Sequence, residues 1–154
     1  MNQYLKKFVE STFDNPGKAL DLGAGNFINV LYLEQMGWKC EGVDIKNGVD
    51  LEFPYISKAG PFDLVFSNYV IHKIKNQNQF IQTAFDNLKK NGWLFIQTFD
   101  NSDLNSSSNI TAEYMQKLLT KREFKNISAK IIECYDNEEG HKHWHKILEI
   151  SAQK

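Results

Sequence analysis

The apolar residues of this chain follow two spacings, which predict an alternation of helices and strands. Spacings of three and four residues, typical of one helix face, predict four helices, at residues 2–13, 26–37, 78–88 and 111–121. Shorter apolar runs predict buried strands, at residues 18–22, 38–45, 62–71, 93–99, 124–136 and 143–153. We expect Asn26 to cap the second helix, and Gly37 and Gly92 to end the second and third helices.

This alternation predicts an α/β fold with a mostly parallel sheet, Rossmann-like and doubly wound, with helices on both faces. The last two strands are joined only by the short turn of residues 137–140, so we expect them to be antiparallel to each other. Only 18 residues separate Asp44 from Asp63, near the start of the next strand. A crossover alone needs about 10–12 residues. The third βα unit is therefore predicted to be shortened or absent, with an irregular loop over residues 46–61.

The most informative stretch is the first strand with the glycine turn that follows it. Gly23 and Gly25 stand one residue apart, and glycine permits both a tight turn and close approach of a ligand to the main chain. The turn fails the dinucleotide pattern G-x-G-x-x-G, because Ile28 stands at the sixth position. Asp21 at the strand end would repel a phosphate but suits a ligand with a cationic amine, such as S-adenosylmethionine. The alternative is an ordinary turn that this aspartate caps.

Polar residues also end the next two strands, namely Asp44 and the pair Ser67 and Asn68. Asp44 comes 19 residues after Gly25, a spacing that places an acid to accept hydrogen bonds from ribose hydroxyls. Because ligands bind at the carboxyl ends of parallel strands, we expect these side chains to converge with Asp21 on one edge of the sheet. The alternative for Asp44 is an ordinary turn position.

The length and composition predict one folded domain. The chain has 154 residues, of which 42% are hydrophobic and 24% charged, within the usual range for one domain. Residues 1–17 form an N-terminal helix and its end, residues 18–100 form the core with the predicted cofactor site, and residues 101–154 form a lid loop, a helix and a C-terminal hairpin. The polar segment of residues 101–109 is expected to be flexible and to lie beside the site.

Charge and cysteine content exclude several classes of function. A net charge of −1 gives no clear nucleic-acid signal. No apolar run reaches the roughly 18 residues of a membrane helix, and the N-terminus lacks the features of a secretory signal. Cys40 and Cys134 are isolated, so they predict neither a disulfide framework nor a zinc site. We therefore expect a cytoplasmic protein.

Several segments together resemble the class I S-adenosylmethionine-dependent methyltransferases, and in particular small, single-domain members. ALDLGAG resembles the family's first motif and GVDI the second. VDLEFPY resembles the acidic segment after the third strand, and FDLVFSNYVIHKI the fourth-strand motif. LKKNGWLFIQT resembles the segment that leads into the fifth strand. The resemblance covers residues 18–100 in detail, and it implies S-adenosylmethionine as the cofactor.

The resemblance also implies a role for each matching position. The implied cofactor contacts lie at strand ends or in the loops that follow: Asp21, Gly23, Gly25, Asp44, Ile45, Asp50, Leu51, Ser67 and Asn68. The first three would hold the methionine part, and Asp44 would bind the ribose. Ile45, Asp50 and Leu51 would face the adenine ring. The last two would lie beside the reacting methyl group.

Histidines provide the candidates for proton transfer. Methyl transfer from a sulfonium requires chiefly proximity and orientation, and it needs a base only where the acceptor must lose a proton. His72 follows the strand of residues 62–71, and His141, His143 and His145 alternate along the last strand, so these three are expected to share one face. His72 and His143 are the candidate catalytic residues, and no metal site is predicted. The alternative is a solvated hairpin with one packed histidine.

Two departures from the family pattern leave a second hypothesis open. Phe27 stands at the usual third glycine, and the third βα unit is short. Either could weaken cofactor binding, which would leave a non-catalytic binding module or subunit with a methyltransferase fold. A nicotinamide-dependent oxidoreductase is disfavoured by Ile28 and Asp21. The leading hypothesis is an enzyme that transfers methyl groups to a small molecule, because no added domain is present to recognise a macromolecule. A partner subunit could still supply such recognition.

Overall fold

The computed structural model describes residues 2–138 and 141–154, without the side chains of residues 137, 138 and 141. Its strands are β1 (Lys18–Leu22), β2 (Lys39–Val43), β3 (Phe62–Asn68), β4 (Leu88–Phe99), β5 (Lys125–Glu138) and β6 (His141–Gln153). Its α-helices are α1 (Gln3–Thr12), α2 (Ile28–Gln35), α3 (Gln77–Asn87) and α4 (Ala112–Lys121), and two 3₁₀ turns are η1 (Ile45–Asn47) and η2 (Ile71–Lys73). No helix of this described part is both long and apolar enough to cross a bilayer.

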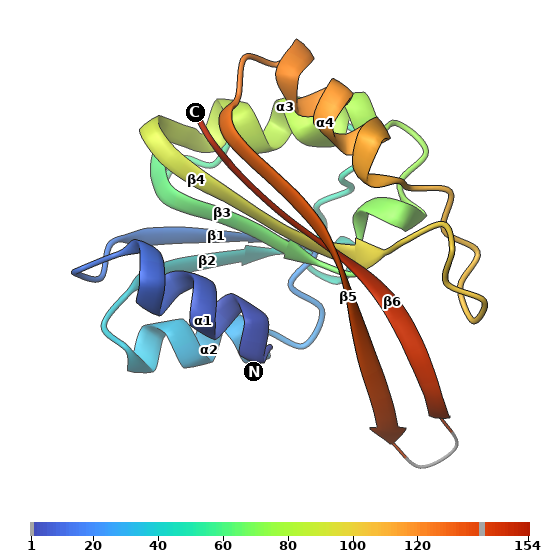
Figure 1. Ribbon diagram of the computed structural model, residues 1–154. Helices are drawn as coiled ribbons and strands as arrows, with labels where there is room; N and C mark the ends of the chain where they lie inside the picture. The colour runs from blue at the N-terminus through green and yellow to red at the C-terminus, as the bar shows by residue number, and fades with distance from the viewer. Residues whose placement is uncertain (1, 139–140) are drawn as a thin grey trace.

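The strands form one mixed sheet in the order β2-β1-β3-β4-β6-β5 (Figure 1). The four strands β2, β1, β3 and β4 are parallel, whereas β6 is antiparallel to both β4 and β5. This confirms the predicted α/β class and the antiparallel C-terminal pair. Between β2 and β3 the chain contains only η1 and irregular loop, so the prediction of a missing third unit is also confirmed.

Helices cover both faces of the sheet, α1 and α2 on one and α3 and α4 on the other (Figure 1). Side chains alternate between the faces along each strand: Leu64 and Phe66 of β3 pack with Leu5 of α1, whereas Val65 packs with Phe80 of α3. All five side chains are fully buried. The two apolar layers fix the register of the sheet, since a slip by one residue would exchange its faces.

Two predicted helix ends are wrong. Asn26 is not the N-cap of α2; Phe27 is, with a left-handed φ of 63° and no side-chain cap bond. Gly92 does not end α3, which stops at Asn87 because β4 begins at Leu88 and pairs there with Phe62 of β3. A tertiary strand contact thus decides where this helix stops.

The hairpin of β5 and β6 extends beyond the helical layers (Figure 1). Its backbone pairing runs from Lys125↔Gln153 to Glu138↔His141. Two residues of the predicted turn, Asn137 and Glu138, therefore belong to β5, and the other two lie outside the described residues.

Candidate functional site

A cleft of about 620 Å³ opens at the carboxyl ends of β1, β2 and β3. This volume is within the range typical of small-molecule sites. Its walls come from the glycine turn, from the segment after β2 and from the segment after β3: Gly23, Gly25, Asp44, Ile45, Lys46, Val49, Asp50, Leu51, Glu52, Asn68, Tyr69, Val70, Lys73 and Ile74. Seven of the nine sequence-predicted cofactor positions lie in this lining; Asp21 and Ser67 do not.

The glycine turn is held against the end of β2 by its backbone. The N–H groups of Gly23 and Ala24 donate to the carbonyl of Val43 at 2.8 and 3.0 Å. Gly23 has φ +89°, and an added Cβ would overlap the Val70 side chain. Gly25 has φ +57°, and a Cβ there would meet nothing within 4 Å. Gly23 therefore serves the packing of the turn, whereas Gly25 leaves open space above the main chain.

Asp44 stands where β2 ends, with both carboxylate oxygens bound to the backbone. Oδ2 accepts from the N–H of Gly25 at 3.0 Å, and Oδ1 accepts from the N–H of Lys46 at 3.0 Å. The Lys46 bond is the largest cause that holds the pKa of Asp44 below its ordinary value, and the charges of Lys46 and Lys73 act in the same direction. The group is therefore an anion of fixed orientation on the cleft wall.

Asp21 lies beneath the turn rather than in the lining. Its side chain is buried, with 2% exposed. Burial, and next to it the charge of Asp44, raise the pKa of Asp21 to about 8. The carboxyl is therefore mostly protonated at neutral pH, and a cation placed beside it would favour its ionised form.

The two residues that end β3 have different environments. Ser67 is buried and donates from its hydroxyl to the carbonyl of Leu22 at 2.6 Å, so it ties β3 to β1. Asn68 lines the cleft, and its Oδ1 accepts from Nδ2 of Asn2, which also donates to Oε1 of Gln97. Within the described residues, Nδ2 of Asn68 and Nε2 of Gln97 are buried without a hydrogen-bond partner. Two amide donors thus lie unused at this strand end.

The segment after β2 combines apolar and acidic side chains. Ile45 is 72% exposed, although it belongs to the cleft lining, whereas Leu51 of the same lining is buried. Asp50 caps its own turn by accepting from the N–H of Glu52 at 3.0 Å. Glu52 in turn accepts the N–H groups of Lys75 and Asn76, at 2.8 and 3.0 Å. An exposed isoleucine beside oriented acids offers an apolar surface for a flat ring.

Sequence reasoning missed part of this lining, including Lys46, Glu52 and Lys73. Lys46 directly follows the predicted Ile45, and Glu52 directly follows the predicted Leu51. Their position next to a predicted site residue is the only feature of the sequence that could have indicated them. Phe27, whose place at the usual third glycine could have weakened cofactor binding, does not line the cleft. A Cβ built on Gly42 would lie 2.7 Å from its ring, so the phenylalanine occupies the space that this glycine of β2 leaves open.

The structure separates His72 from the cleft. It lines a neighbouring cavity of about 510 Å³ together with Asn109 and Tyr114. Its Nδ1 lies 3.0 Å from Oγ1 of Thr98. Burial, and then the charge of Lys73, lower the pKa of His72 and so favour its neutral form.

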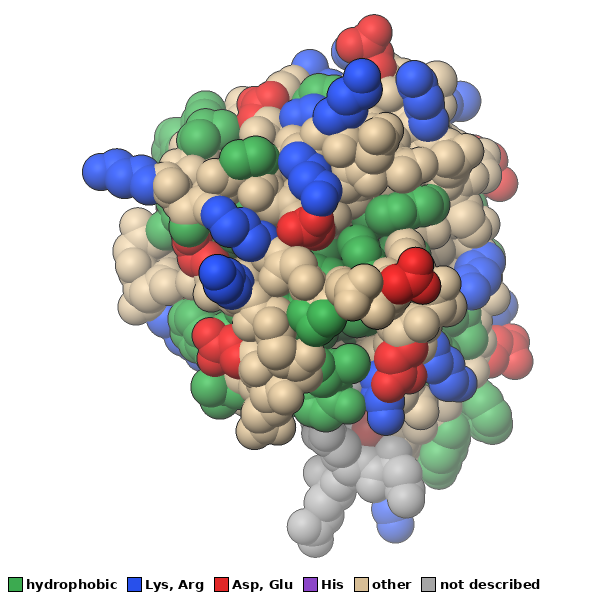
Figure 2. All heavy atoms as spheres, turned by 90° about the vertical axis from the view of Figure 1, so that its left-hand side faces the viewer, with side chains coloured by type: hydrophobic (Ala, Val, Ile, Leu, Met, Phe, Trp, Pro, Cys, Tyr) green, Lys and Arg blue, Asp and Glu red, His purple; other side chains and the backbone are tan. Residues whose placement is uncertain are grey.

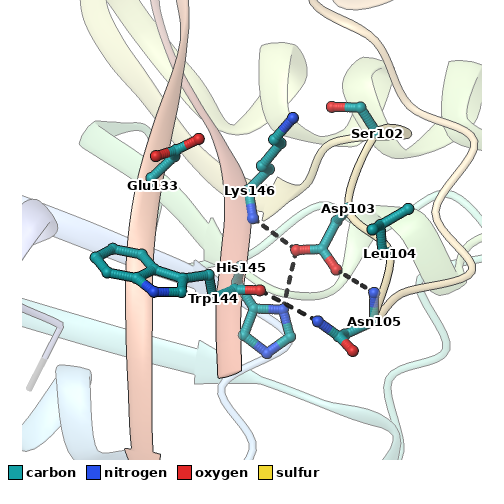
Figure 3. A pocket seen from close by; sticks show the side chains of 8 residues that line it. All are labelled: Ser102, Asp103, Leu104, Asn105, Glu133, Trp144, His145 and Lys146. Atoms are coloured by element: carbon teal, nitrogen blue, oxygen red, sulfur yellow. Dashed lines mark hydrogen bonds and ion pairs between the residues drawn. The ribbon is translucent and has the colours of Figure 1, made fainter. Parts of the chain in front are cut away.

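Two of the hairpin histidines form a second polar site with the loop after β4. Nε2 of His143 lies 2.9 Å from Nε2 of His145, and Nδ1 of His145 lies 2.9 Å from Oδ2 of Asp103. The two rings share a face of β6, as predicted, whereas the side chain of His141 lies outside the described part. Asp103 and His145 also border a cavity of about 460 Å³ between this loop and the hairpin, with Trp144 on its wall (Figure 3).

The loop that contributes Asp103 is irregular, as predicted, but buried polar side chains anchor it. Asp103 accepts the N–H of Lys146 on β6, and Ser108 donates to the carbonyl of Phe99 at 2.6 Å. The N–H of Asn101 donates to the carbonyl of Ile110 at 2.8 Å. These bonds connect the loop to β4 and β6, while its expected flexibility stays a prediction.

Phe99, at the end of β4, connects the cleft with the histidines. Its ring centroid lies 5.1 Å from Tyr69, 5.2 Å from His72 and 4.9 Å from His145.

The opposite end of the sheet, which faces the viewer in Figure 2, shows acidic and basic side chains interspersed and no histidine in view. Among the described residues, no three His, Cys, Asp or Glu side chains are grouped so that they could hold a metal ion.

The comparison with protein families agrees with this geometry. A family model described as "Methyltransferase domain" matches residues 1–147. No protein among those with curated descriptions matches the chain.

Solved structures share the fold at low sequence identity. A S-adenosylmethionine-dependent methyltransferase of Methanosarcina mazei superposes with a TM-score of 0.77 and 14% identity, over 96% of each chain. One from Archaeoglobus fulgidus gives a TM-score of 0.74 and 12% identity, over 99% of this chain and 92% of the other. The 1,6-didemethyltoxoflavin-N1-methyltransferase of Burkholderia thailandensis gives 0.75 and 15%, over 99% and 77%. At these identities the likeness concerns the fold.

Proposed function

The chain belongs to the methyltransferase-domain family, and from this premise we propose that it transfers a methyl group from S-adenosylmethionine to a small-molecule acceptor. The observation that carries the proposal is the convergence of Gly25, Asp44 and Asn68 on one cleft. They come from three different strand ends. A nucleoside with an amino-acid tail needs a turn that lets it approach the main chain, an acceptor for its ribose hydroxyls and a donor for an acceptor oxygen.

The donors and acceptors of the cleft fit this cofactor. Each oxygen of Asp44 uses one hydrogen bond to the backbone, so lone pairs remain for two neighbouring ribose hydroxyls. The exposed face of Ile45 suits the adenine ring. The unused amide hydrogens of Asn68 suit an acceptor oxygen, and Gly25 lets a ligand approach the main chain.

Asp21 acts on the cationic end of the cofactor through its charge. Its carboxyl is buried beneath the turn and mostly protonated without a ligand. A cationic amine nearby would lower its pKa and release the proton, so cofactor affinity should increase as the pH rises toward 8. The bound cofactor supplies a methyl group on a sulfonium with its own leaving group, and the chain supplies orientation and exclusion of water.

Two observations support a small acceptor. The Burkholderia thailandensis structure named above contains 1,6-didemethyltoxoflavin and S-adenosylhomocysteine, so a chain of this fold acts on a small heterocycle. The cavities beside the aromatic cluster of Phe99 are of small-molecule size, about 460 and 510 Å³.

Phe27 lies against Gly42 rather than in the cleft, which removes one of the two grounds for a non-catalytic module.

Calorimetry with S-adenosylmethionine tests the cofactor site. Wild-type protein should bind it, and Asp44→Ala should weaken binding by about 1–3 kcal/mol through loss of charge-assisted hydrogen bonds. Asp14→Ala, which changes an exposed acid outside the cleft, is the matched control and should bind like wild type. No heat from wild type at millimolar ligand would contradict the proposal. Equal affinity of both variants would contradict the site assignment.

A further inference from the structure

We propose that the cavity beside His72 binds the methyl acceptor, and that Lys73 and Lys75 hold a carboxylate or phosphate group of this molecule. The cavity, here called the basic cavity, has a volume of about 510 Å³. Its lining comes mainly from the segment after β3, the loop after β4 and α4: His72, Lys73, Ile74, Lys75, Asn109 and Tyr114. The inference rests on the proposed function and deepens it, because it names the chemical class of the acceptor.

The basic cavity adjoins the cofactor cleft. The two share Lys73 and Ile74 as lining residues. An acceptor has to come within about 3–3.5 Å of the methyl carbon that it attacks, so it must lie directly beside the cofactor. The cavity of about 460 Å³ at Asp103 shares no lining residue with the cleft. Of these two cavities, the basic cavity is therefore the one placed for an acceptor.

The lining of the basic cavity is positively charged. Among the described residues it contains two lysines and no Asp or Glu. The side chains of Lys73 and Lys75 are exposed, and in the described part of the chain neither ammonium group forms an ion pair with a carboxylate. Both groups are thus available to an anion from outside the protein.

The acids closest in charge to these lysines belong to the cleft. Asp44 interacts with Lys73 and Glu52 with Lys75 through their charges, but both acids line the cleft and not the basic cavity. Each of their four carboxylate oxygens accepts a backbone N–H. The acids therefore lie on the side of the cationic cofactor, and the lysines lie on the side proposed for the acceptor.

This separation of charge selects an anionic acceptor. Lysine ammonium groups form charge-assisted hydrogen bonds with carboxylate and phosphate oxygens, and a cavity lined by one sign of charge concentrates ligands of the opposite sign. After burial, which is the larger cause, the charge of Lys73 lowers the pKa of His72, so its field reaches the opposite part of the lining. Tyr114 and Asn109 add uncharged donors, and Ile74 offers an apolar contact for the rest of the molecule.

Ordinary solvated lysines would make a different prediction. Lys117 of α4 is also exposed, and it lines neither the basic cavity nor the cleft. If the lysines acted only through the overall charge of the protein, Lys75→Gln and Lys117→Gln would change anion binding alike. Lys117→Gln is therefore the matched control. Lys75→Gln is the main variant, because Lys73 also lines the cleft.

A titration with inorganic phosphate, without any cofactor, tests the anion site. The ring signals of His72 are followed by NMR and assigned by their loss in His72→Gln, and potassium chloride of equal ionic strength serves as the control for screening. Phosphate should shift these signals to saturation and raise the pKa of His72, because a bound anion favours the imidazolium form. Lys75→Gln should weaken phosphate binding by about tenfold or more, through loss of a charge-assisted hydrogen bond. Lys117→Gln should bind phosphate like wild type.

Two outcomes of this titration would overturn the inference. The first is a His72 signal that responds to millimolar phosphate no more than to chloride. The second is a phosphate affinity that Lys75→Gln and Lys117→Gln leave equal.

Paired acceptors with one common nucleophile then test the acceptor class. The pairs are histidinol with histidinol phosphate, and imidazoleacetamide with imidazoleacetate, so that the phosphate and the carboxylate are tested separately on an imidazole. With labelled S-adenosylmethionine, the anionic member of at least one pair should have a KM about tenfold lower or less, and Lys75→Gln should remove this preference. Equal KM values within both pairs, or a preference that Lys75→Gln leaves intact, would overturn the inference. If none of the four is methylated, their affinities read from the His72 signal replace the KM values, with the same expected order.

Calorimetry with S-adenosylmethionine separates a failure of this inference from a failure of the proposed function. A protein that binds S-adenosylmethionine but shows no phosphate response at His72 would contradict the anionic acceptor alone. A protein that binds phosphate at His72 but gives no heat with S-adenosylmethionine would contradict the proposed function, and with it the role of the basic cavity as an acceptor site.

Discussion

The cleft at the ends of β1, β2 and β3 and the site formed by Asp103, His143 and His145, here called the loop–hairpin site, are built in different ways. The cleft uses short segments directly after β1, β2 and β3, and its key bonds connect backbone groups with side chains that a parallel sheet brings together automatically. The Asp103–His145 pair joins residues 42 positions apart, through a loop and an antiparallel strand. The first site follows from local motifs and strand order, whereas the second depends on how one loop packs against one hairpin.

This difference predicts different sensitivities. The cleft should respond to changes in backbone conformation and in buried charge within the glycine turn. The loop–hairpin site should respond to loss of a single long-range ion pair. Four substitutions test the contrast, in order of decreasing expected effect on the free energy of unfolding.

The largest effect is expected for Gly23→Ala. The backbone of residue 23 is left-handed, which strains an alanine, and the new Cβ would overlap the Val70 side chain. The free energy of unfolding should therefore fall by about 4 kcal/mol. Gly25→Ala is the control, since its Cβ meets open space. It should lose about 1 kcal/mol but bind S-adenosylmethionine more weakly. Urea unfolding measures the first quantity and calorimetry the second; equal stability losses would contradict the division of roles between the two glycines.

Asp21→Asn should increase stability and weaken cofactor binding. The unfolded carboxyl ionises near pH 4, whereas the folded one stays protonated up to about 8. The unfolded state therefore binds fewer protons in this window, and wild-type stability falls as the pH rises through it. The variant lacks this slope, so its stability advantage over wild type should grow as the pH rises from 4 to 8. Denaturant titrations between pH 4 and 8 give both slopes, and parallel curves would contradict the assignment.

Asp103→Asn should lower the free energy of unfolding by about 2 kcal/mol at pH 7, because a buried charge-assisted network is broken. The depressed pKa of Asp103 makes its contribution present above the ordinary pKa near 4 and lost as the pH falls through the folded value. The difference between variant and wild type should therefore shrink in acid. A difference that stays constant down to pH 2 would show that charge is not involved.

Asn2→Ala should have the smallest effect, about 1 kcal/mol from loss of a helix N-cap. The Asn2 side chain accepts from the N–H groups of Tyr4 and Leu5 and donates to Asn68 and Gln97. Asn15→Ala, at an exposed position after α1, is the control. Thermal unfolding of both variants checks the prediction, and a loss as large as that of Asp103→Asn would contradict the ranking.

The sequence by itself determined the fold class, the missing third unit and most of the cleft. These features depend on hydrophobic spacing, on glycines and on acids at strand ends, and a parallel sheet places such strand ends on one edge whatever the other side chains are. The same logic predicted that His143 and His145 share a face.

Only the tertiary structure decided the burial of Asp21, the position of Phe27 and the partner of His145. The neutral state of Asp21 depends on the layers packed around it and on the charge of Asp44. Phe27 is accommodated because Gly42 lies opposite on another strand. Asp103 sits in a polar loop that no periodicity marks, and its role arises from a buried contact across 42 residues. The spacing of apolar residues shows which side of a helix or strand is buried. The pKa of a buried group and the packing of a side chain also depend on which helices, strands and loops meet in the folded chain.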